Sequence, residues 1–184
     1  MKYPPTPGQT VGPFFHDALP YFGGSDLVPP GHPGRIHLHG TVFDGAGTPI
    51  PDALVEIWQA DAGGSASRAT GSLRRDGFTF TGFGRAATDG TGGYSFSTVA
   101  PGPIAPASAA FFSVCVFARG LLDRLLTRAY LPGDDASLAA DPLLVSLPPE
   151  RRSTLIAAPD AHGFVFDIRL QGEGETVFLW HGSR

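Results

Sequence analysis

The chain has 184 residues, a formal net charge of −4 and 42% hydrophobic residues, which fit one domain that buries a substantial core. No run of basic residues is present, so the composition argues against nucleic acid or an acidic membrane surface as partner and favours a small molecule or a protein. The 25 glycines and 18 prolines favour many short strands joined by tight turns.

The sequence contains no signal for export or for a membrane span. The first residues lack the apolar core of a signal peptide, and no apolar run is long enough to cross a bilayer. Cys115 is the only cysteine, so no disulfide can form within the chain, and its valine neighbours predict a buried thiol. We therefore expect a cytoplasmic protein.

Residues 1–34 are expected to form an N-terminal arm and connector, followed by a single β-sandwich domain over residues 35–184. Residues 6–16 hold too much proline and glycine for a regular element, yet Val11 and Phe14 are too apolar to stay in water. The arm therefore either packs across its own domain or a neighbour, or lines a pocket. Composition alone favours the first interpretation.

The segment from residue 35 to 40 alternates apolar Ile36 and Leu38 with His37 and His39, which predicts a strand. The two histidines then share one face, at a spacing that could bind a metal. A half-buried strand with its polar face in water explains the pattern as well. Since no acidic residue or third histidine is near in the sequence, the second interpretation is favoured.

Residues 41–43 and 53–58 are predicted to form a strand, turn and strand. The turn at residues 44–47 contains the small residues that tolerate positive φ, and the second run is β-branched and apolar. Residues 65–84 are polar and glycine-rich, so we expect a long loop of the kind that carries function or an interface.

Two more strands, at residues 85–88 and 93–99, surround a turn at Asp89-Gly90. Residues 111–118 are apolar on both faces, which predicts a central strand. Arg119 follows that strand at a turn, where its guanidinium could hold a carboxylate with both arms. A surface salt bridge is an equal alternative.

Residues 121–131 fit a strand or a short helix, and the bounding residues favour a strand. Asp141 before a proline predicts a short helix over residues 142–147, and residues 150–156 favour a further helical turn.

Residues 164–170 alternate cleanly and predict a strand, and residues 176–179 are expected to form the closing strand. The sum predicts an all-β fold, a two-sheet β-sandwich of some eight strands with short helical segments and an extended N-terminal arm. No phosphate loop, nucleophile-base motif or spaced carboxylate pair is present.

Five segments carry a resemblance to the intradiol ring-cleaving dioxygenases, and it spans nearly the whole chain. They are TPGQTVGPFF (6–15), VEIWQADAGG (55–64), TVAPG (98–102), FARG (117–120) and FDIRLQGEGETVFL (166–179). The last is the most specific, because it resembles the alpha subunit of heteromeric members more than the family at large. The resemblance implies the intradiol type of β-sandwich.

In that family two tyrosines and two histidines bind Fe(III), a hard ligand set that suits this ion. The resemblance places those four positions at Ala66, Ile104, Phe111 and Ser113, so all four ligands are missing. It therefore implies that this chain binds no metal. A homologous beta subunit would hold the Fe(III), with the active site at the interface of a hetero-oligomer.

The resemblance also gives this chain a substrate-binding role, in which Thr10, Gly12, Pro13 and Phe14 line the partner's pocket. Phe14 departs from the tyrosine common in the family and lacks its hydroxyl. Arg119 would orient or attract the carboxylate of the substrate. The implied reaction is the opening of a catechol acid by O2 between its hydroxyl-bearing carbons, giving a carboxymuconate.

Two rival hypotheses remain open at this point. The chain could be a non-catalytic binding or structural module that kept the sandwich, or an independent metalloenzyme that uses His37 and His39. A homologue in the neighbouring reading frame with both tyrosines and both histidines would favour the subunit over the module.

Overall fold

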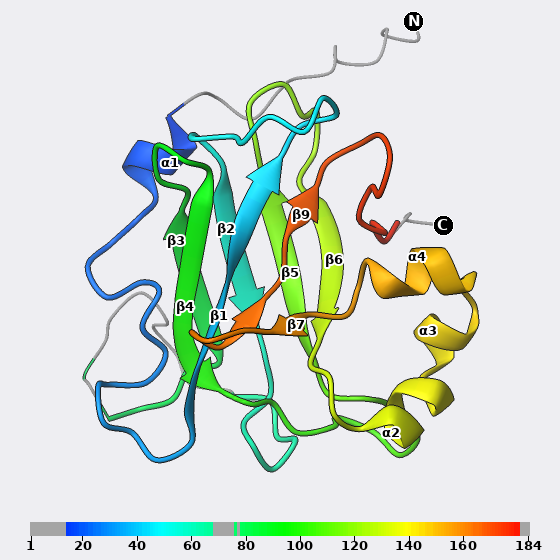
Figure 1. The fold of residues 1–184 in the computed structure, drawn as a ribbon. Coiled ribbons are helices and arrows are strands. Elements are labelled where there is room, and N and C mark those ends of the chain that lie inside the picture. Colours follow the sequence, from blue (N-terminus) through cyan, green and yellow to red (C-terminus); the bar gives the residue numbers. More distant parts are fainter. Residues whose placement is uncertain (1–13, 68–75, 77, 181–184) are drawn as a thin grey trace, which may run out of the picture.

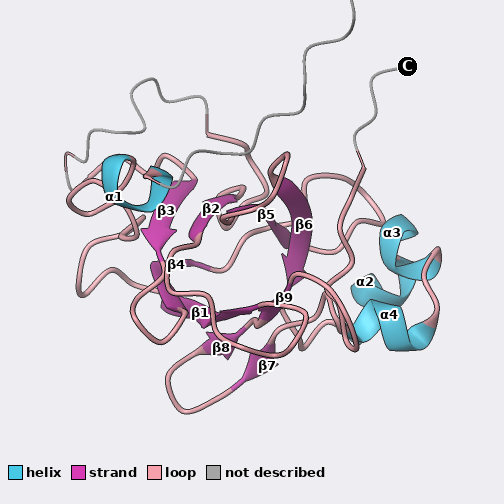
Figure 2. Cartoon of the chain, turned by 90° about the horizontal axis from the view of Figure 1, so that it is seen from above, coloured by secondary structure: helices cyan, strands magenta, loops and turns pink. Residues whose placement is uncertain are grey.

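The structure, a computed structural model, describes residues 14–67, 76 and 78–180 of the chain. Two β-sheets lie face to face in this part, as Figure 1 shows from the side and Figure 2 from above. The four-stranded sheet has the order β3 (Phe83–Ala87), β2 (Leu54–Trp58), β5 (Phe111–Phe117) and β6 (Leu125–Tyr130). The five-stranded sheet has the order β4 (Gly93–Val99), β1 (Arg35–Phe43), β8 (Phe164–Val165) and β7 (Ala158–Pro159), and β9 (Ile168–Arg169) also pairs with β1. The predicted two-sheet all-β sandwich is confirmed.

Four short helices flank the sandwich. They are α1 (Phe15–Ala18), α2 (Asp135–Ala140), α3 (Pro142–Val145) and α4 (Pro149–Ser153). Figure 2 shows α2 to α4 gathered beyond β6 and α1 at the opposite side, near β3. Asp141 caps α3 by accepting from the N–H groups of Leu143 and Leu144, as its position before a proline predicts. The helical turn expected next is α4, whereas α2 was not predicted. None of the helices in the described residues has the length and apolar composition that crossing a membrane requires.

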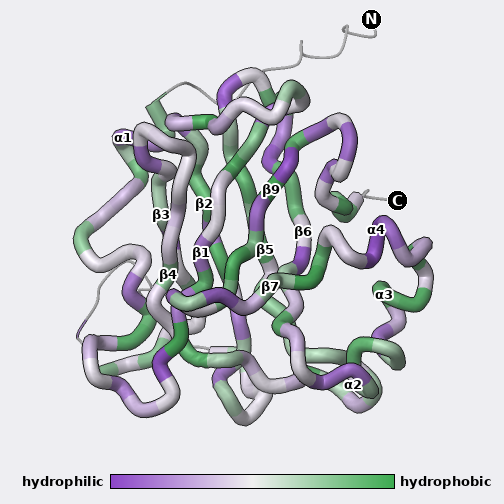
Figure 3. The backbone as a smooth tube through the Cα atoms, viewed as in Figure 1, coloured by the Kyte–Doolittle hydropathy of each residue, from purple (hydrophilic) through white to green (hydrophobic). Residues whose placement is uncertain are grey.

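β5 is the central strand that the sequence predicts, because it pairs antiparallel with β2 on one side and with β6 on the other. Phe112, Val114 and Val116 point between the sheets and are at most 1% exposed. Figure 3 shows hydrophobic residues following β2 and β5 through the middle of the molecule. The prediction of a strand within residues 121–131 is also correct, since β6 occupies its second half.

The strand, turn and strand predicted within residues 41–58 are present, but they do not form a hairpin, because the two strands lie in different sheets. β1 pairs with β4, whereas β2 pairs with β3 and β5. The turn itself exists, since the Asp44 carboxylate accepts from the N–H groups of Ala46 and Thr48. Pro49 and Pro51 follow it and lack the N–H groups that a second ladder strand would need, so the chain crosses to the other sheet. β3 and β4 separate in the same way after the turn at Asp89.

The strand predicted over residues 164–170 is interrupted. β8 and β9 both pair parallel with β1 in one continuous register. Between them Phe166 N–H still donates to the His39 carbonyl at 2.7 Å, but Phe166 and Asp167 are not paired as strand residues. The Phe166 carbonyl accepts from the buried hydroxyl of Tyr94, and the Asp167 carboxylate accepts from the N–H of Thr41. Side chains thus provide the other hydrogen bonds that a ladder would make at this point.

The closing strand expected at residues 176–179 is not formed. This segment lies beside β6, where Leu179 N–H donates to the Leu126 carbonyl at 2.7 Å and the Thr127 hydroxyl donates to the Val177 carbonyl at 2.7 Å. One of these bonds comes from a side chain rather than the backbone, so the pairing is too sparse for a strand.

The connector before β1 packs on the sandwich. Leu27 and Val28 are each 4% exposed, and Leu27 N–H donates to the Ser97 carbonyl of β4 at 2.8 Å. The expectation that residues 6–16 contain no regular element is wrong at its end, because Phe15 turns into the core and begins α1.

Candidate functional site

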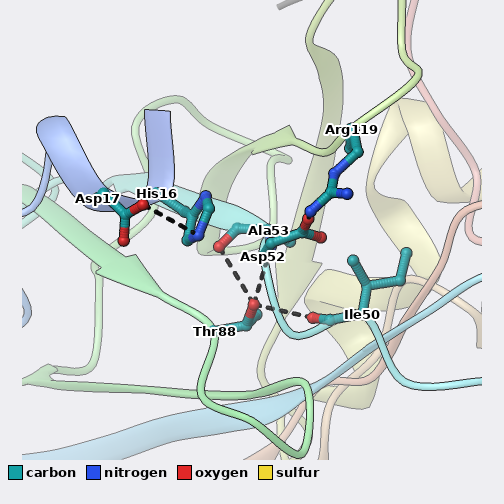
Figure 4. A network of polar contacts seen from close by, with 7 residues as sticks. All are labelled: His16, Asp17, Ile50, Asp52, Ala53, Thr88 and Arg119. Atoms are coloured by element: carbon teal, nitrogen blue, oxygen red, sulfur yellow. Dashed lines mark hydrogen bonds and ion pairs between the residues drawn. The ribbon is translucent and has the colours of Figure 1, made fainter. Parts of the chain in front are cut away.

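The charged end of the four-stranded sheet holds Arg119, the residue predicted to meet a carboxylate. β2 and β5 pair with Leu54 opposite Phe117, so continuing this antiparallel register by two residues sets Asp52 opposite Arg119. The Arg119 guanidinium donates through Nη2 to Asp52 Oδ2 (Figure 4). Its side chain is 67% exposed while that of Asp52 is 14% exposed, so the pair presents the arginine outward from a sheltered carboxylate.

Thr88 fixes the backbone on both sides of Asp52. Its hydroxyl accepts from the N–H of Ala53 at 2.9 Å and donates to the carbonyl of Ile50 at 2.8 Å (Figure 4). Thr88 is 6% exposed and Ala53 is fully buried, so water does not compete for these bonds. The turn that carries Asp52 is therefore held rigidly at the start of β2.

Helix α1 brings the described end of the arm to the same end of the sheet. The rings of Phe15 and Phe117 lie 6.3 Å apart, and Phe117 is two residues before Arg119. Phe14 precedes the helix and is 71% exposed. His16 Nε2 lies 3.5 Å from Asp17, while its Nδ1 is buried and has no hydrogen-bond partner within the described residues. The structure thus brings Phe14 and Arg119 to one end of the molecule.

The remaining arm residues of the prediction lie outside the described residues. They are Thr10, Gly12 and Pro13. Their proposed contacts with a substrate stay a prediction.

The opposite end of the sheet gathers three of the four positions that the resemblance assigned to iron ligands. Ala66, Ile104 and Phe111 line one pocket of about 160 Å³. Ser113 is the register partner of Trp58, which lines the same pocket. Because β5 has seven residues at about 3.3 Å each, this end lies about 20 Å from the end that leads to Arg119.

The side chains at these four positions do not fit a ferric ion. Methyl, butyl and phenyl groups offer no lone pair, and a single serine hydroxyl cannot replace two phenolates and two imidazoles. Arg128 lies with its guanidinium carbon 3.9 Å from the centre of the Phe111 ring, and it is the register partner of Ser113. Its positive charge further opposes a cation here. The described residues contain no cluster of three or more His, Cys, Asp or Glu side chains that could hold a metal.

The backbone around this metal-incompetent pocket is nevertheless tightly organised. The buried Gln59 amide donates to the Val99 carbonyl at 2.9 Å and accepts from the Thr98 hydroxyl, which ties the end of β2 to the end of β4. Gly64 approaches Pro103 so closely that an added Cβ would lie 2.2 Å from its carbonyl oxygen. The backbone at the four positions that the resemblance assigns to iron ligands is thus well ordered, although their side chains offer no ligand set.

Asp141 braces the same end of the sheet. It is fully buried, and its carboxylate accepts from the Tyr130 hydroxyl at 3.1 Å and the Ala109 N–H at 3.1 Å, besides the two N–H groups of α3. Tyr130 is the register partner of Phe111. Burial raises the pKa of Tyr130 to about 12, so it remains a neutral hydrogen-bond donor. Sequence reasoning recognised Asp141 only as a helix cap and missed this wider role.

His37 and His39 lie on β1 and line an open groove of about 810 Å³ at the outer face of the five-stranded sheet. His39 Nε2 lies 3.2 Å from Asp160, and its ring centre lies 6.4 Å from that of His162, so acidic and histidine neighbours distant in sequence do approach it. The Asp160 carboxylate is already occupied by the N–H groups of His162 and Gly163, which lower its pKa together with His39. The polar-face interpretation of the two histidines fits this arrangement.

Cys115 lies in the middle of β5 and is 8% exposed, as its valine neighbours predict. Burial, aided by the negative charge of Glu56, raises the pKa of its thiol to about 12. The thiol therefore stays protonated and unreactive.

Comparisons with known proteins agree with this scaffold. A family model described as "Dioxygenase" matches residues 12–172. The alpha chain of protocatechuate 3,4-dioxygenase from Burkholderia cepacia is 39% identical over 191 residues, which cover 95% of this chain and 96% of that relative. The beta chain from the same organism is 33% identical, over 95% of this chain and 80% of that relative.

Among solved structures, the dioxygenase domain of a dioxygenase carbohydrate-binding fusion protein from Streptomyces sp. SirexAA-E superposes with a TM-score of 0.56. It is 26% identical, and the match covers 92% of this chain and 99% of that chain. The match supports the fold.

Proposed function

This chain belongs to the intradiol dioxygenase family, and we propose that within the family it acts as the alpha subunit of a protocatechuate 3,4-dioxygenase. In this proposal a homologous beta subunit binds Fe(III), and the present chain completes the substrate pocket at the interface. The proposal is consistent with similarity to both kinds of chain, at 39% identity to an alpha chain and 33% to a beta chain.

The observation that carries the proposal is the contrast between an intact scaffold and an absent ligand set. Ala66, Ile104 and Phe111 come together in one pocket but have no metal-binding atom among them. If a chain that folds in this way yet lacks the family's metal ligands takes part in the family's reaction, a second chain has to supply the metal.

The chemical task of this chain would fall to Arg119 and the arm. The guanidinium has five N–H donors, and only Nη2 is engaged by Asp52, so the remaining donors are free of partners within the described residues. A carboxylate on an aromatic ring can accept from this planar fork, which fixes the orientation of the ring at the partner's site. The arm would cover the ring and exclude water.

The proposed reaction opens protocatechuate between its two hydroxyl-bearing carbons. O2 adds one oxygen atom to each of these carbons as the bond between them breaks, so both oxygen atoms enter the product, 3-carboxy-cis,cis-muconate. The chemistry of oxygen addition belongs to the iron of the beta subunit. This chain contributes the pose of the substrate and the shape of the pocket.

Purification of the chain alone and together with its beta homologue tests the proposal. The lone chain should contain no stoichiometric iron and should lack the red colour of a ferric-tyrosinate centre. The complex should contain one iron per pair of chains and consume O2 when protocatechuate is added. A matched variant with His37→Gln and His39→Gln should keep the iron content of the complex.

Two results would overturn this assignment. Tight iron in the lone chain would refute the argument from the missing ligands. A beta homologue that is fully active alone and forms no complex with this chain would instead favour a non-catalytic binding or structural module.

A further inference from the structure

We propose that Asp52 is a positioning residue that aims the free donors of Arg119 at the substrate carboxylate, an inference that rests on the function proposed above. Nothing in the sequence singles out Asp52. Its role follows from the register of β2 and β5, which sets it opposite Arg119 just beyond the last paired residues.

The arrangement has the asymmetry that a positioning pair requires. Asp52 is sheltered, at 14% exposure, and its backbone is fixed through the bonds of Thr88 to Ile50 and Ala53. Arg119 is 67% exposed and follows the buried Ala118 at the start of a turn. An exposed arginine without a partner would sample many rotamers, whereas an ion pair to a rigid carboxylate restricts them. The rigidly held carboxylate of Asp52 therefore restricts the conformations of the Arg119 side chain.

The geometry also leaves room for a second carboxylate. Asp52 engages Nη2, and the described residues provide no partner for the Nε and Nη1 donors. The guanidinium can thus bridge the internal carboxylate and an external one. Because Asp52 neutralises the charge of Arg119, the field of the pair decays quickly with distance, so the pair should orient a bound substrate rather than steer it from afar.

Variants of Asp52 in the iron-loaded complex with the beta subunit test the inference. Asp52→Asn keeps an acceptor and removes the charge, while Asp52→Ala removes both. We expect the KM for protocatechuate to rise about threefold to fivefold in the Asn variant, the range of a partly exposed ion pair, and further in the Ala variant. The kcat should change less, and plain catechol, which has no carboxylate, should be turned over as before.

Binding of 4-hydroxybenzoate provides a readout that does not depend on turnover. This ligand keeps the carboxylate and lacks one ring hydroxyl, and its dissociation constant by calorimetry should rise by the same factor. The matched control is Asp17→Asn, which removes an exposed carboxylate on α1 at the same end of the molecule without touching Arg119. It should leave both constants unchanged.

A double variant separates this inference from the function on which it rests. If Asp52 acts through Arg119, Asp52→Asn should have no further effect once Arg119→Leu is present. If Arg119→Leu raises the KM but Asp52→Asn leaves it unchanged or lowers it, the positioning inference is wrong and Asp52 is neutral or competes with the substrate. If Arg119→Leu leaves the KM unchanged in an assembled complex, the substrate-binding role proposed for this chain is wrong, whatever the result for Asp52.

Discussion

The two ends of β5 differ in chemistry although one strand joins them. At the Phe111 end, Ala66 and Ile104 meet the phenyl ring in a small pocket that lacks metal ligands. At the other end, the exposed side chain of Arg119 forms an ion pair with the sheltered carboxylate of Asp52. The strand fixes where both ends lie, while the residues at each end determine what that end can bind.

The two ends also differ in how they are held. Asp141 alone accepts hydrogen bonds from a helix, from β6 and from the loop before β5 at the Phe111 end. The Arg119 end relies on Thr88 and on one ion pair. Changes at Asp141 should therefore act on stability, changes at Arg119 should act on binding, and changes at Thr88 should act on both.

The largest expected effect is the loss of stability caused by Asp141→Ala. The change leaves the Tyr130 hydroxyl and the Ala109 N–H without acceptors in a dry environment, besides removing the cap of α3. We expect the free energy of unfolding to fall by about 3 to 4 kcal/mol, measured by urea denaturation.

Asp134→Ala is the matched control, because that carboxylate also caps a helix but is exposed and accepts from Ser137 alone. It should cost about 1 kcal/mol. Equal losses for the two variants would show that Asp141 is no more than a cap.

The next largest effect is expected at Arg119. In the complex with the beta subunit, Arg119→Leu removes the charge and the planar fork, while Arg119→Lys keeps the charge alone. Both variants should raise the KM for protocatechuate, and the Leu variant should raise it more. The expected rise corresponds to about 1 to 3 kcal/mol of binding free energy from the lost charged hydrogen bonds. Plain catechol should be affected much less.

Salt separates the two possible roles of Arg119. If the residue only steers, Lys should behave like the parent protein, and the Leu defect should shrink at high salt. Normal assembly and unchanged turnover of both substrates by the Leu variant would contradict the role of this end.

A smaller effect is expected from Thr88→Val, which keeps the shape of the side chain and removes its hydroxyl. The buried Ala53 N–H then loses its acceptor, and the Ile50 carbonyl loses a donor. We expect a loss of about 1 to 2 kcal/mol in the free energy of unfolding and a higher KM for protocatechuate in the complex. Thr88→Ser keeps the hydroxyl and should restore most of both, whereas equal losses in Ser and Val would point to packing alone.

The smallest effect is a pH dependence from Cys115, midway between the two ends. The pKa of its thiol is raised from 9.0 to about 12, so above pH 9 the unfolded chain loses this proton while the folded chain keeps it. The free energy of unfolding should therefore fall as the pH rises from about 9 towards 12, and Cys115→Ala should make that fall shallower. Denaturant titrations at several pH values measure the slope, and an identical slope in both proteins would contradict the assignment.

The sequence by itself determined the strands that carry strong local patterns. The apolar run of β5 marked a central strand, and Asp141 before Pro142 marked a helix start, because both signals lie within a few residues. The missing ligand types at Ala66 and Ile104 are likewise a matter of side-chain chemistry, which the sequence states directly. The assignment of those positions to iron ligands came from the resemblance to the family, whereas Arg119 could be proposed as a carboxylate binder from its place at the end of a strand.

Only the tertiary structure decided which strands are partners. The segments at residues 41–43 and 54–58 look like a hairpin, yet they belong to different sheets, because local turn chemistry does not specify long-range pairing. The role of Asp52 depends on that pairing, since it stands opposite Arg119 only when β2 lies beside β5. The bonds of Tyr94 to Phe166 and of Tyr130 to Asp141 also join positions with no shared local pattern. Such contacts form only when the two sheets pack together, because the residues that make them are far apart in the sequence.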